Sequence, residues 1–325
     1  MFSIFTKRQN PANATVAPTT APTEHIERGE HQELQLGLLL ALLAALGFSL
    51  KAIFVKLAYG YGVSAVSLLC LRMAMSLPVF FWVGLTASRH APPLSGRDKW
   101  MLLAMGMLGY YGASIFDFIG LHYISAGLER IILFTYPTLT VLIGVCFQGK
   151  TLAKREIGAL ALCYVGIAAA FAHDLHFANT ESQAIWIGAA FVFASSLSYA
   201  LYLSGVGGMI ARLGSARFTA LAMLVSTGAS FLHFTISEPL NGLLGQPWQV
   251  YGLSAAMAVF STVLPVFMQT AAIRRLGANR AALIGTIGPM LTIFFGWWWL
   301  SETLSLWQFG GMVLVVAGVL LVSRR

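Results

Sequence analysis

Long apolar segments recur from about residue 36 to the end of the chain, separated by short polar connections. Each segment holds about 20 residues, which is the length an α-helix needs to cross a hydrocarbon core of about 30 Å. The pattern predicts ten spans at 36–58, 64–86, 100–122, 125–147, 155–172, 184–205, 215–235, 250–273, 279–300 and 306–323. We therefore expect an all-α integral membrane protein.

The chain also carries an internal repeat. The stretch 117–166 aligns without a gap on the end of the chain when it is shifted by 152 positions. The aligned residues that constrain the backbone are Pro137 with Pro289, Gly144 with Gly296, Gly158 with Gly310, and Gly166 with Gly318. Because proline and glycine each fix an unusual backbone geometry, their shared register indicates a tandem duplication. The expected division is a disordered tail at 1–33, a first repeat at 34–172 and a second at 184–323.

Basic residues occur only in alternate loops, which predicts how the chain lies in the membrane. One set of connections holds Arg89, Arg97, Lys99, Lys150, Lys154, Arg155, Arg212, Arg217, Arg274, Arg275, Arg324 and Arg325. The other connections, at 59–63, 123–124, 173–183, 236–249 and 301–305, hold no Lys or Arg. The positive-inside rule then places both termini in the cytoplasm. Since each repeat has an odd number of spans, the second repeat is inverted relative to the first.

Composition agrees with a membrane protein. Hydrophobic residues make up 58% of the chain and charged residues 10%, whereas about a quarter of a soluble domain is charged. The net charge of +8 comes from basic residues between apolar segments, so it favours membrane orientation over nucleic-acid binding. The 3 cysteines lie within or at the ends of apolar segments, which is typical of buried thiols.

One motif match is rejected. The run from Gly144 to Thr151 fits the phosphate-binding pattern G-x-x-x-x-G-K-[ST], which functions between a strand and a helix. Here it lies at the inner end of a predicted membrane helix. Its repeat partner, from Gly296 to Thr303, lacks the Gly-Lys pair. The sequence contains no clustered metal ligands with characteristic spacing, so we expect neither a metal nor another cofactor.

Charged residues inside the predicted spans are the candidate functional residues, because a charge deep in a bilayer costs at least about 2.5 kcal/mol. They are Lys51, Lys56, Arg72, Asp117, Glu129 and Arg130, all in the first repeat. At about 1.5 Å per residue, all of them fall between the midplane and the outer surface. This common level is typical of a substrate-binding vestibule or an outer gate. Structural ion pairing is the alternative.

Several of these residues have individual interpretations. Lys56 is close enough to a helix end to extend its ammonium to the interface. Asp117 shares a helical stripe with Ser114 and Tyr110, which suits the wall of a polar pocket. Glu129 and Arg130 point about 100° apart, so at least one of them needs a partner on another helix.

The neighbouring proline segments predict a cavity. Tyr136 lies seven residues after Glu129, on the same helical face, and is a further candidate for a pocket wall. Pro137 and Pro289 each remove one helical hydrogen bond, so we expect both helices to kink near mid-membrane. Kinks at paired positions open room between the repeats for a solute.

The duplicated layout resembles the drug/metabolite transporter superfamily, and specifically its EamA-like families of ten-helix carriers. The resemblance covers the chain from about residue 36 and uses Ser125-Ala126-Gly127, Gly277-Ala278-Asn279, Glu302-Thr303-Leu304, Gly310-Gly311, Arg72, Gly158 and Gly166. It implies a multi-pass protein of the cell membrane, in bacteria the inner membrane. It also implies ATP-independent transport, with export as the expected direction, of small organic solutes such as amino acids or other metabolites. The first repeat departs from the family pattern, since Lys150 stands where the second has Glu302.

The charge balance of the buried residues indicates the kind of solute. With Lys56 at the interface, three cations (Lys51, Arg72 and Arg130) face two acids (Asp117 and Glu129). A buried guanidinium cannot lose its proton, so an anionic or zwitterionic solute would complete the pairing. Loss of the proton from Lys51 is the competing explanation.

Two other classes of function stay open, a membrane-embedded enzyme and a channel or sensor. An enzyme would need a nucleophile or metal at the depth of Asp117 and Glu129, and the sequence offers none. An inverted duplication is what alternating access uses, which favours a carrier over a channel. The sequence leaves the oligomeric state open.

Overall fold

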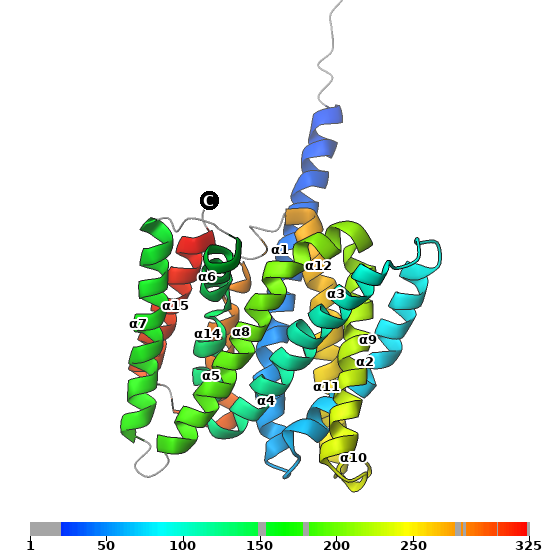
Figure 1. The fold of residues 1–325 in the computed structure, drawn as a ribbon. Helices are drawn as coiled ribbons and strands as arrows, with labels where there is room; N and C mark the ends of the chain where they lie inside the picture. The colour runs from blue at the N-terminus through cyan, green and yellow to red at the C-terminus, as the bar shows by residue number, and fades with distance from the viewer. Residues whose placement is uncertain are drawn as a thin grey trace, which may run out of the picture.

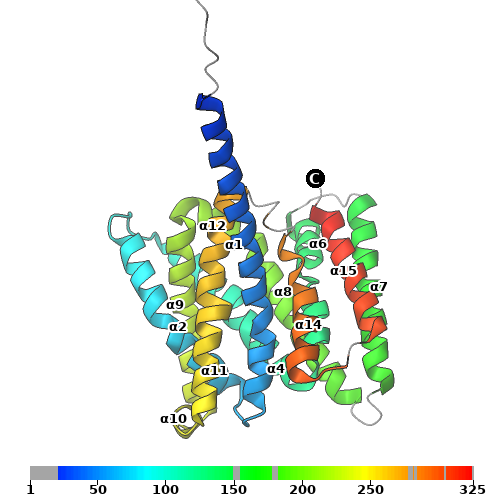
Figure 2. The same ribbon diagram turned by 180° about the vertical axis from the view of Figure 1, so that it is seen from behind.

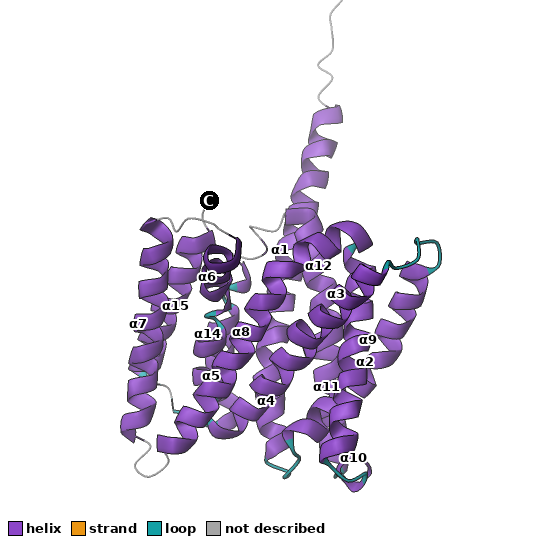
Figure 3. Ribbon diagram, in the orientation of Figure 1, coloured by secondary structure: helices purple, strands orange, loops and turns teal. Residues whose placement is uncertain are grey.

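The computed structural model describes residues 21–148, 154–177, 182–276, 281, 284–303 and 305–323, and all regular structure within these ranges is helical (Figures 1 and 3). The elements are α1 (Ala21–Tyr59), α2 (Ala65–Ser88), α3 (Gly96–Gly106), η1 (Met107–Gly112), α4 (Ala113–Tyr123), α5 (Ala126–Leu133), α6 (Tyr136–Gln148), α7 (Lys154–Phe177), α8 (Ser182–Leu213), α9 (Ser215–Ser237), α10 (Asn241–Leu244), α11 (Trp248–Ala258), η2 (Val259–Val263), α12 (Leu264–Leu276), α14 (Gly288–Leu300) and α15 (Leu306–Ser323). The two elements labelled η are short π-helical turns inside longer helices.

Seven continuous helices in the described chain are long and apolar enough to cross a membrane. Two shorter apolar helices, Ile157–Ala172 and Leu306–Leu321, lie within α7 and α15, and the apolar helix α14 has 13 residues. The prediction of an all-α membrane protein is therefore confirmed. The number of spans and the cytoplasmic position of the termini stay predictions.

The first helix begins earlier than the sequence predicts. We expect a disordered tail up to residue 33, but α1 starts at Ala21 and residues 21–33 are helical. The segment is rich in Glu, Gln and His, and it continues a long helix, so it avoids the cost of nucleating a new one. Glu33 is paired with Arg275 of α12, with 2.9 Å between the carboxylate and Nε. Residues 1–20 lie outside the described residues.

The helices form a bundle with two distinct faces. Figure 1 shows the projecting start of α1 and the C-terminal end of α15 on one face, which we call the terminal face. The opposite, distal face holds α10, the α1–α2 turn and the α4–α5 turn (Figures 1 and 2). The first helix of one repeat, α1, enters from the terminal face, and the first helix of the other, α8, enters from the distal face. The repeats therefore run in opposite directions.

The two repeats share their helix irregularities in register. The π-helical turns begin at Met107 and at Val259, which are 152 positions apart. The breaks share this offset: one separates α5 from α6 at residues 134–135, and the other precedes α14 at residues 286–287. The expected kinks at Pro137 and Pro289 are thus full breaks just before the prolines. Each proline is the second residue of the new segment, where its missing N–H costs nothing.

Glycines permit the close packing of α7 against α15, the last helices of the two repeats. A Cβ at Gly166 would collide with the carbonyl oxygen of Gly311, and one at Gly311 with that of Gly166. Gly318 likewise faces Cys163 and the carbonyl oxygen of Ala159. Small residues let the backbones approach, which is the main source of contact between helices in lipid.

The orientation of the faces can be tested with cysteines in a background that lacks the native ones. Leu244 in α10 is 77% exposed on the distal face, and Pro93 is exposed on the terminal face. If the positive-inside rule holds, a membrane-impermeant thiol reagent applied to intact cells should label Leu244→Cys and leave Pro93→Cys unlabelled until the cells are opened. The reverse pattern would contradict a cytoplasmic terminal face.

Candidate functional site

A cavity of about 580 Å³ lies between the two repeats, at the level of their irregularities. The same repeat positions line it from both sides. The π-helical turns supply Gly109 and Tyr110 from one repeat and Ser261 and Thr262 from the other; the helix breaks supply Leu133, Phe134 and Tyr136, and Gly285, Thr286 and Gly288. The breaks and π-helical turns thus make the space that ordinary packed helices would fill.

Three cations lie at one end of this cavity. Lys51, Arg72 and Arg130 all line it, and no acidic residue of the described chain does. At 1.5 Å per residue, Lys51 and Arg72 lie about 12 Å and about 10 Å from the distal ends of α1 and α2. Gln269, at the other end, is about 30 Å along its helix from that face. The cavity therefore extends from the cations toward the terminal face.

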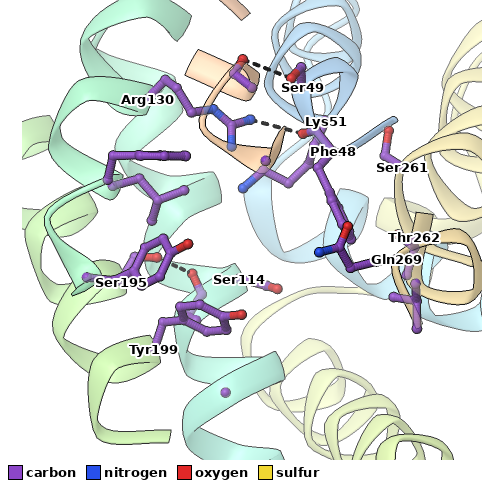
Figure 4. A pocket seen from close by; sticks show the side chains of 18 of the residues that line it. Phe48, Ser49, Lys51, Ser114, Arg130, Ser195, Tyr199, Ser261, Thr262 and Gln269 are labelled. Atoms are coloured by element: carbon purple, nitrogen blue, oxygen red, sulfur yellow. Dashed lines mark hydrogen bonds between the residues drawn. The ribbon is translucent and has the colours of Figure 1, made fainter. Parts of the chain in front are cut away.

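The two buried acids stand behind the cations. Asp117 is 1% exposed and Glu129 is fully buried. The ammonium of Lys51 lies 2.6 Å from Oδ2 of Asp117 and 3.7 Å from Oε1 of Glu129, and Nε of Arg130 lies 3.8 Å from Oε2 of Glu129. Arg130 also donates from Nη2 to the carbonyl oxygen of Phe48 at 3.0 Å (Figure 4). This network joins α1, α4 and α5 on the distal side of the cavity.

Arg72 is the cation without a carboxylate partner among the described residues. It is 5% exposed, its Nη2 donates to Oγ of Ser114 at 2.9 Å, and its guanidinium lies 5.0 Å from the centre of the Phe118 ring. Its Nε has no hydrogen-bond partner. Neither the hydroxyl nor the ring carries a negative charge, and Asp117, the acid whose charge acts on Arg72, is ion-paired with Lys51.

The structure brings some of the predicted site residues into the cavity and excludes others. Lys51, Arg72, Arg130, Tyr110 and Tyr136 line it, and they are joined by Pro137 from the predicted hinge positions. Asp117, Glu129 and Pro289 do not line it.

The positions of these residues along the helices account for the exclusions. Ser114 and Asp117 both lie in α4, and Asp117 is one helical turn nearer the distal end, where Lys51 pairs with it. The seven-residue spacing from Glu129 to Tyr136 spans the break at 134–135, so it does not define one helical face. A role of Asp117 and Glu129 in substrate binding or gating stays a prediction.

Each broken helix is held by a serine from the first helix of the other repeat. Ser196 of α8 donates to the carbonyl oxygen of Leu133 at 3.1 Å and lies 2.7 Å from the hydroxyl of Thr135. Ser49 of α1 donates to the carbonyl oxygen of Gly288 at 2.9 Å (Figure 4). A backbone carbonyl freed inside lipid costs several kcal/mol if it stays unpaired. Ser196 therefore satisfies the carbonyl oxygen that Pro137 leaves free, and Ser49 ties α1 to the first turn of α14.

An aromatic wall lines the cavity beside the first break. Phe134 packs against Tyr136 with ring centres 5.8 Å apart, and Tyr136 packs edge-on against Tyr199 at 5.0 Å. Tyr199 stacks on Tyr202 at 5.5 Å, and the hydroxyl of Tyr202 lies 3.2 Å from that of Tyr110. The wall is apolar with hydroxyls at its rim.

Sequence reasoning missed the cavity residues of the second repeat. Ser195, Tyr199, Ser261, Thr262 and Gln269 all line the space (Figure 4). They are uncharged, so a search for charges in lipid passes over them. Isolated polar side chains in apolar spans, above all Gln269, were the available signal.

Two carboxylates from the second repeat cap helices of the first on the distal face. Glu302 accepts from the backbone N–H of Ala126 at 2.9 Å and of Gly127 at 3.4 Å, at the start of α5. Glu238 accepts from the hydroxyls of Ser64 and Ser67 at the start of α2. A helix N-terminus carries positive partial charge, so both contacts are charge-assisted. They close the two repeats together on this face.

Two inverted repeats of apolar helices around a central cavity are an arrangement found in many secondary transporters. A profile of the EamA-like transporter family matches residues 35–172 and 186–324, once for each repeat. The chain belongs to the EamA-like transporter family, and it is a multi-pass protein of the cell membrane.

Relatives agree with this placement. The chain is 32% identical over 305 residues to the "Uncharacterized transporter YcbK" of Bacillus subtilis (strain 168), covering 90% of this chain and 95% of the relative. It is 24% identical to the "Uncharacterized transporter sll1319" of Synechocystis, covering 89% and 93%. A solved structure titled only "Crystal structure of protein" has the same fold, with a TM-score of 0.60, 18% identity, and coverage of 89% of this chain and 98% of that one. The two relatives from Bacillus subtilis and Synechocystis are described as uncharacterized transporters.

The ion-pair network predicts a coupled effect on stability. Lys51→Met removes the ammonium that faces both Asp117 and Glu129, and the loss of one partner from a buried pair costs about 3–5 kcal/mol. Thermal unfolding in detergent should show this loss, and a second change, Asp117→Asn, should recover most of it. Lys56→Met on the same helix is the control, because Lys56 has no ion pair within the described chain and does not line the cavity. Equal stability of Lys51→Met and Lys56→Met would contradict the network.

Proposed function

We propose that this chain is a secondary transporter that exports a small organic solute carrying an anionic group, by alternating access between its two inverted repeats. The observation that carries the proposal is the cavity between the repeats, which three cations line and no described acid lines. A volume of about 580 Å³ lies within the range of small-molecule sites, about 300–1,000 Å³.

The affinity for the anionic solute comes from compensation of the charge of Arg72. The acids Asp117 and Glu129 are engaged by Lys51 and Arg130, whereas Arg72 has no such partner in the described chain. A guanidinium stays protonated even when it is buried, so the charge of Arg72 needs an anion. A carboxylate bound beside Arg72 supplies it and displaces no existing ion pair.

The contacts that hold the repeats together on the distal face support loading of the solute from the terminal face. The cations, the acids behind them and the capping contacts of Glu238 and Glu302 all lie toward the distal face. The cavity extends the other way, to Gln269 and Val319. Under the positive-inside rule the terminal face is cytoplasmic, so this conformation takes up solute from the cytoplasm, as an exporter requires.

The transport step then exchanges one set of contacts for another. Anion binding beside Arg72 and Arg130 weakens the attraction between Arg130 and Glu129, which are 3.8 Å apart. Opening on the distal face requires the caps of Glu238 and Glu302 to break. The breaks before Pro137 and Pro289 are the hinge positions, because the backbone there has already left helical geometry.

Neutralising Arg72 tests the function. In proteoliposomes, Arg72→Gln should reduce flux of an anionic solute at least about 10-fold, since a lost charge-assisted hydrogen bond is worth about 1.5–3 kcal/mol. Arg217→Gln is a matched control: Arg217 is 7% exposed and donates to Ser88 and Pro92, away from the cavity. The control should keep its flux per folded molecule. Undiminished flux in Arg72→Gln would contradict the proposed role of this cation.

The distal caps can be tested by accessibility. Met223 lines the cavity and is 2% exposed, so Met223→Cys in a background without native cysteines reports access to the site. Combining it with Glu238→Ala and Glu302→Ala should raise its labelling rate from outside by an anionic impermeant reagent roughly 30-fold, as two contacts of about 1 kcal/mol each are lost. Glu33→Ala removes a carboxylate paired on the terminal face and should leave this rate unchanged. An unchanged rate in the double Glu→Ala variant would show that the caps do not hold the closed state.

A further inference from the structure

We propose that the solute is an organic anion with an aromatic or bulky apolar body and without an ammonium group, so that carboxylates are carried in preference to the corresponding amino acids and amines. This inference rests on the proposed transport function and narrows its substrate class. It follows from where charges, backbone oxygens and aromatic rings lie around the cavity.

The anion site is built around Arg72. Its guanidinium is 5% exposed, is held in place by Ser114 and the Phe118 ring, and keeps an unpartnered Nε. Arg130 lies at the same end of the cavity and is oriented by the carbonyl oxygen of Phe48 (Figure 4). Each guanidinium is thus held in place, and a guanidinium suits a planar carboxylate, which accepts two hydrogen bonds side by side.

The cavity offers no matching site for an ammonium. Asp117 and Glu129 are not part of its lining, and both face Lys51. An α-ammonium next to a bound carboxylate would lie close to Lys51, Arg72 and Arg130, and like charges in a medium of low dielectric repel strongly.

At the first break, the backbone oxygen does not replace the missing acid. Half-helix ends in transporters can bind cations through free carbonyls. Here Pro137 has no N–H for the carbonyl oxygen of Leu133, and this oxygen accepts from Ser196 instead. The carbonyl oxygen that the first break frees is therefore already hydrogen-bonded.

Aromatic rings could in principle hold an ammonium on their faces. Tyr199 is the best placed, but it stacks on Tyr202 and packs edge-on against Tyr136. Its ring is engaged with other rings on two sides. The aromatic wall is therefore better suited to packing against an apolar group than to binding a charge.

The body of the solute faces apolar side chains. Phe48, Phe134, Leu133, Met223, Val266 and Val319 line the cavity beyond the cations. A small polar anion would leave this surface in contact with water, whereas a ring or branched chain would cover it and gain binding free energy from burial. The arrangement thus favours an amphipathic anion with its carboxylate toward the distal face.

A matched set of solutes tests this class. 3-Phenylpropanoate, L-phenylalanine and 2-phenylethylamine share one ring and differ in their charged groups, and acetate lacks the ring. We expect 3-phenylpropanoate to stabilise the purified protein against heat and to cross proteoliposomes at least 10-fold faster than the other three. If L-phenylalanine binds as tightly as 3-phenylpropanoate, or more tightly, the exclusion of ammonium groups is overturned. If acetate does so, the requirement for an apolar body is overturned. Absence of binding by all four overturns the substrate class.

The proposed transport function and the proposed substrate class can be contradicted independently of each other. Stabilisation by 3-phenylpropanoate without flux through folded, reconstituted protein supports the binding class and contradicts the transport function. Flux of phenylalanine or the amine without a response to 3-phenylpropanoate supports transport and overturns the class.

A variant pair tests the anion site itself. Ser114→Asp places a carboxylate beside Arg72, whose Nη2 now lies 2.9 Å from the Ser114 hydroxyl. It should reduce 3-phenylpropanoate affinity at least 10-fold, because the guanidinium gains an internal partner. Ser114→Asn has the same shape without the charge and should retain clearly more affinity. Equal affinities in the two variants would contradict an anion site at Arg72; if either variant fails to fold, the solute series on the wild-type protein decides the proposal.

Discussion

An ionised side chain in a hydrocarbon environment has to find a charge or a set of hydrogen bonds, and much of this structure follows from that constraint. Lys51, Asp117, Glu129 and Arg130 meet at one level of the bundle and compensate one another across three helices. Arg72 stands at the same end of the cavity without an acid from the described chain. The charges of the candidate site are therefore unbalanced. Asp117 and Glu129 are paired with Lys51 and Arg130, and the guanidinium of Arg72 faces the space between the repeats.

The duplication supplies that space. Both repeats carry a π-helical turn and a helix break at corresponding positions, and both features line the cavity. In each case a serine from the opposite repeat donates a hydrogen bond to a backbone carbonyl beside the break. The backbone frame is thus nearly symmetric, whereas the charged residues that line the cavity all belong to the first repeat. In the proposed mechanism, the symmetry suits opening in two directions, and the asymmetry confines solute binding to one set of charged residues.

Closure on the distal face depends on a different kind of contact. Glu238 and Glu302 of the second repeat lie at helix N-termini of the first repeat. Hydroxyls and backbone N–H groups there donate hydrogen bonds to the two carboxylates. Such contacts form between rigid ends of elements and need little rearrangement of the core. They can separate without loss of the glycine contact between α7 and α15, which joins the two repeats elsewhere.

The sequence by itself determined the helical membrane class, the duplication, the sorting of basic loops and the identity of the cavity cations, because these follow from apolar length, repeat register and the cost of charge in lipid. Tertiary structure decided which charges face the cavity. Asp117 was expected in the cavity wall, but it lies one helical turn beyond Ser114 and is paired with Lys51. The break at 134–135 removes the helical phase that related Glu129 to Tyr136. The roles of Ser49, Ser196, Glu238 and Glu302 likewise emerged only from the fold, since hydrogen bonds between distant segments leave no periodic signal in the chain.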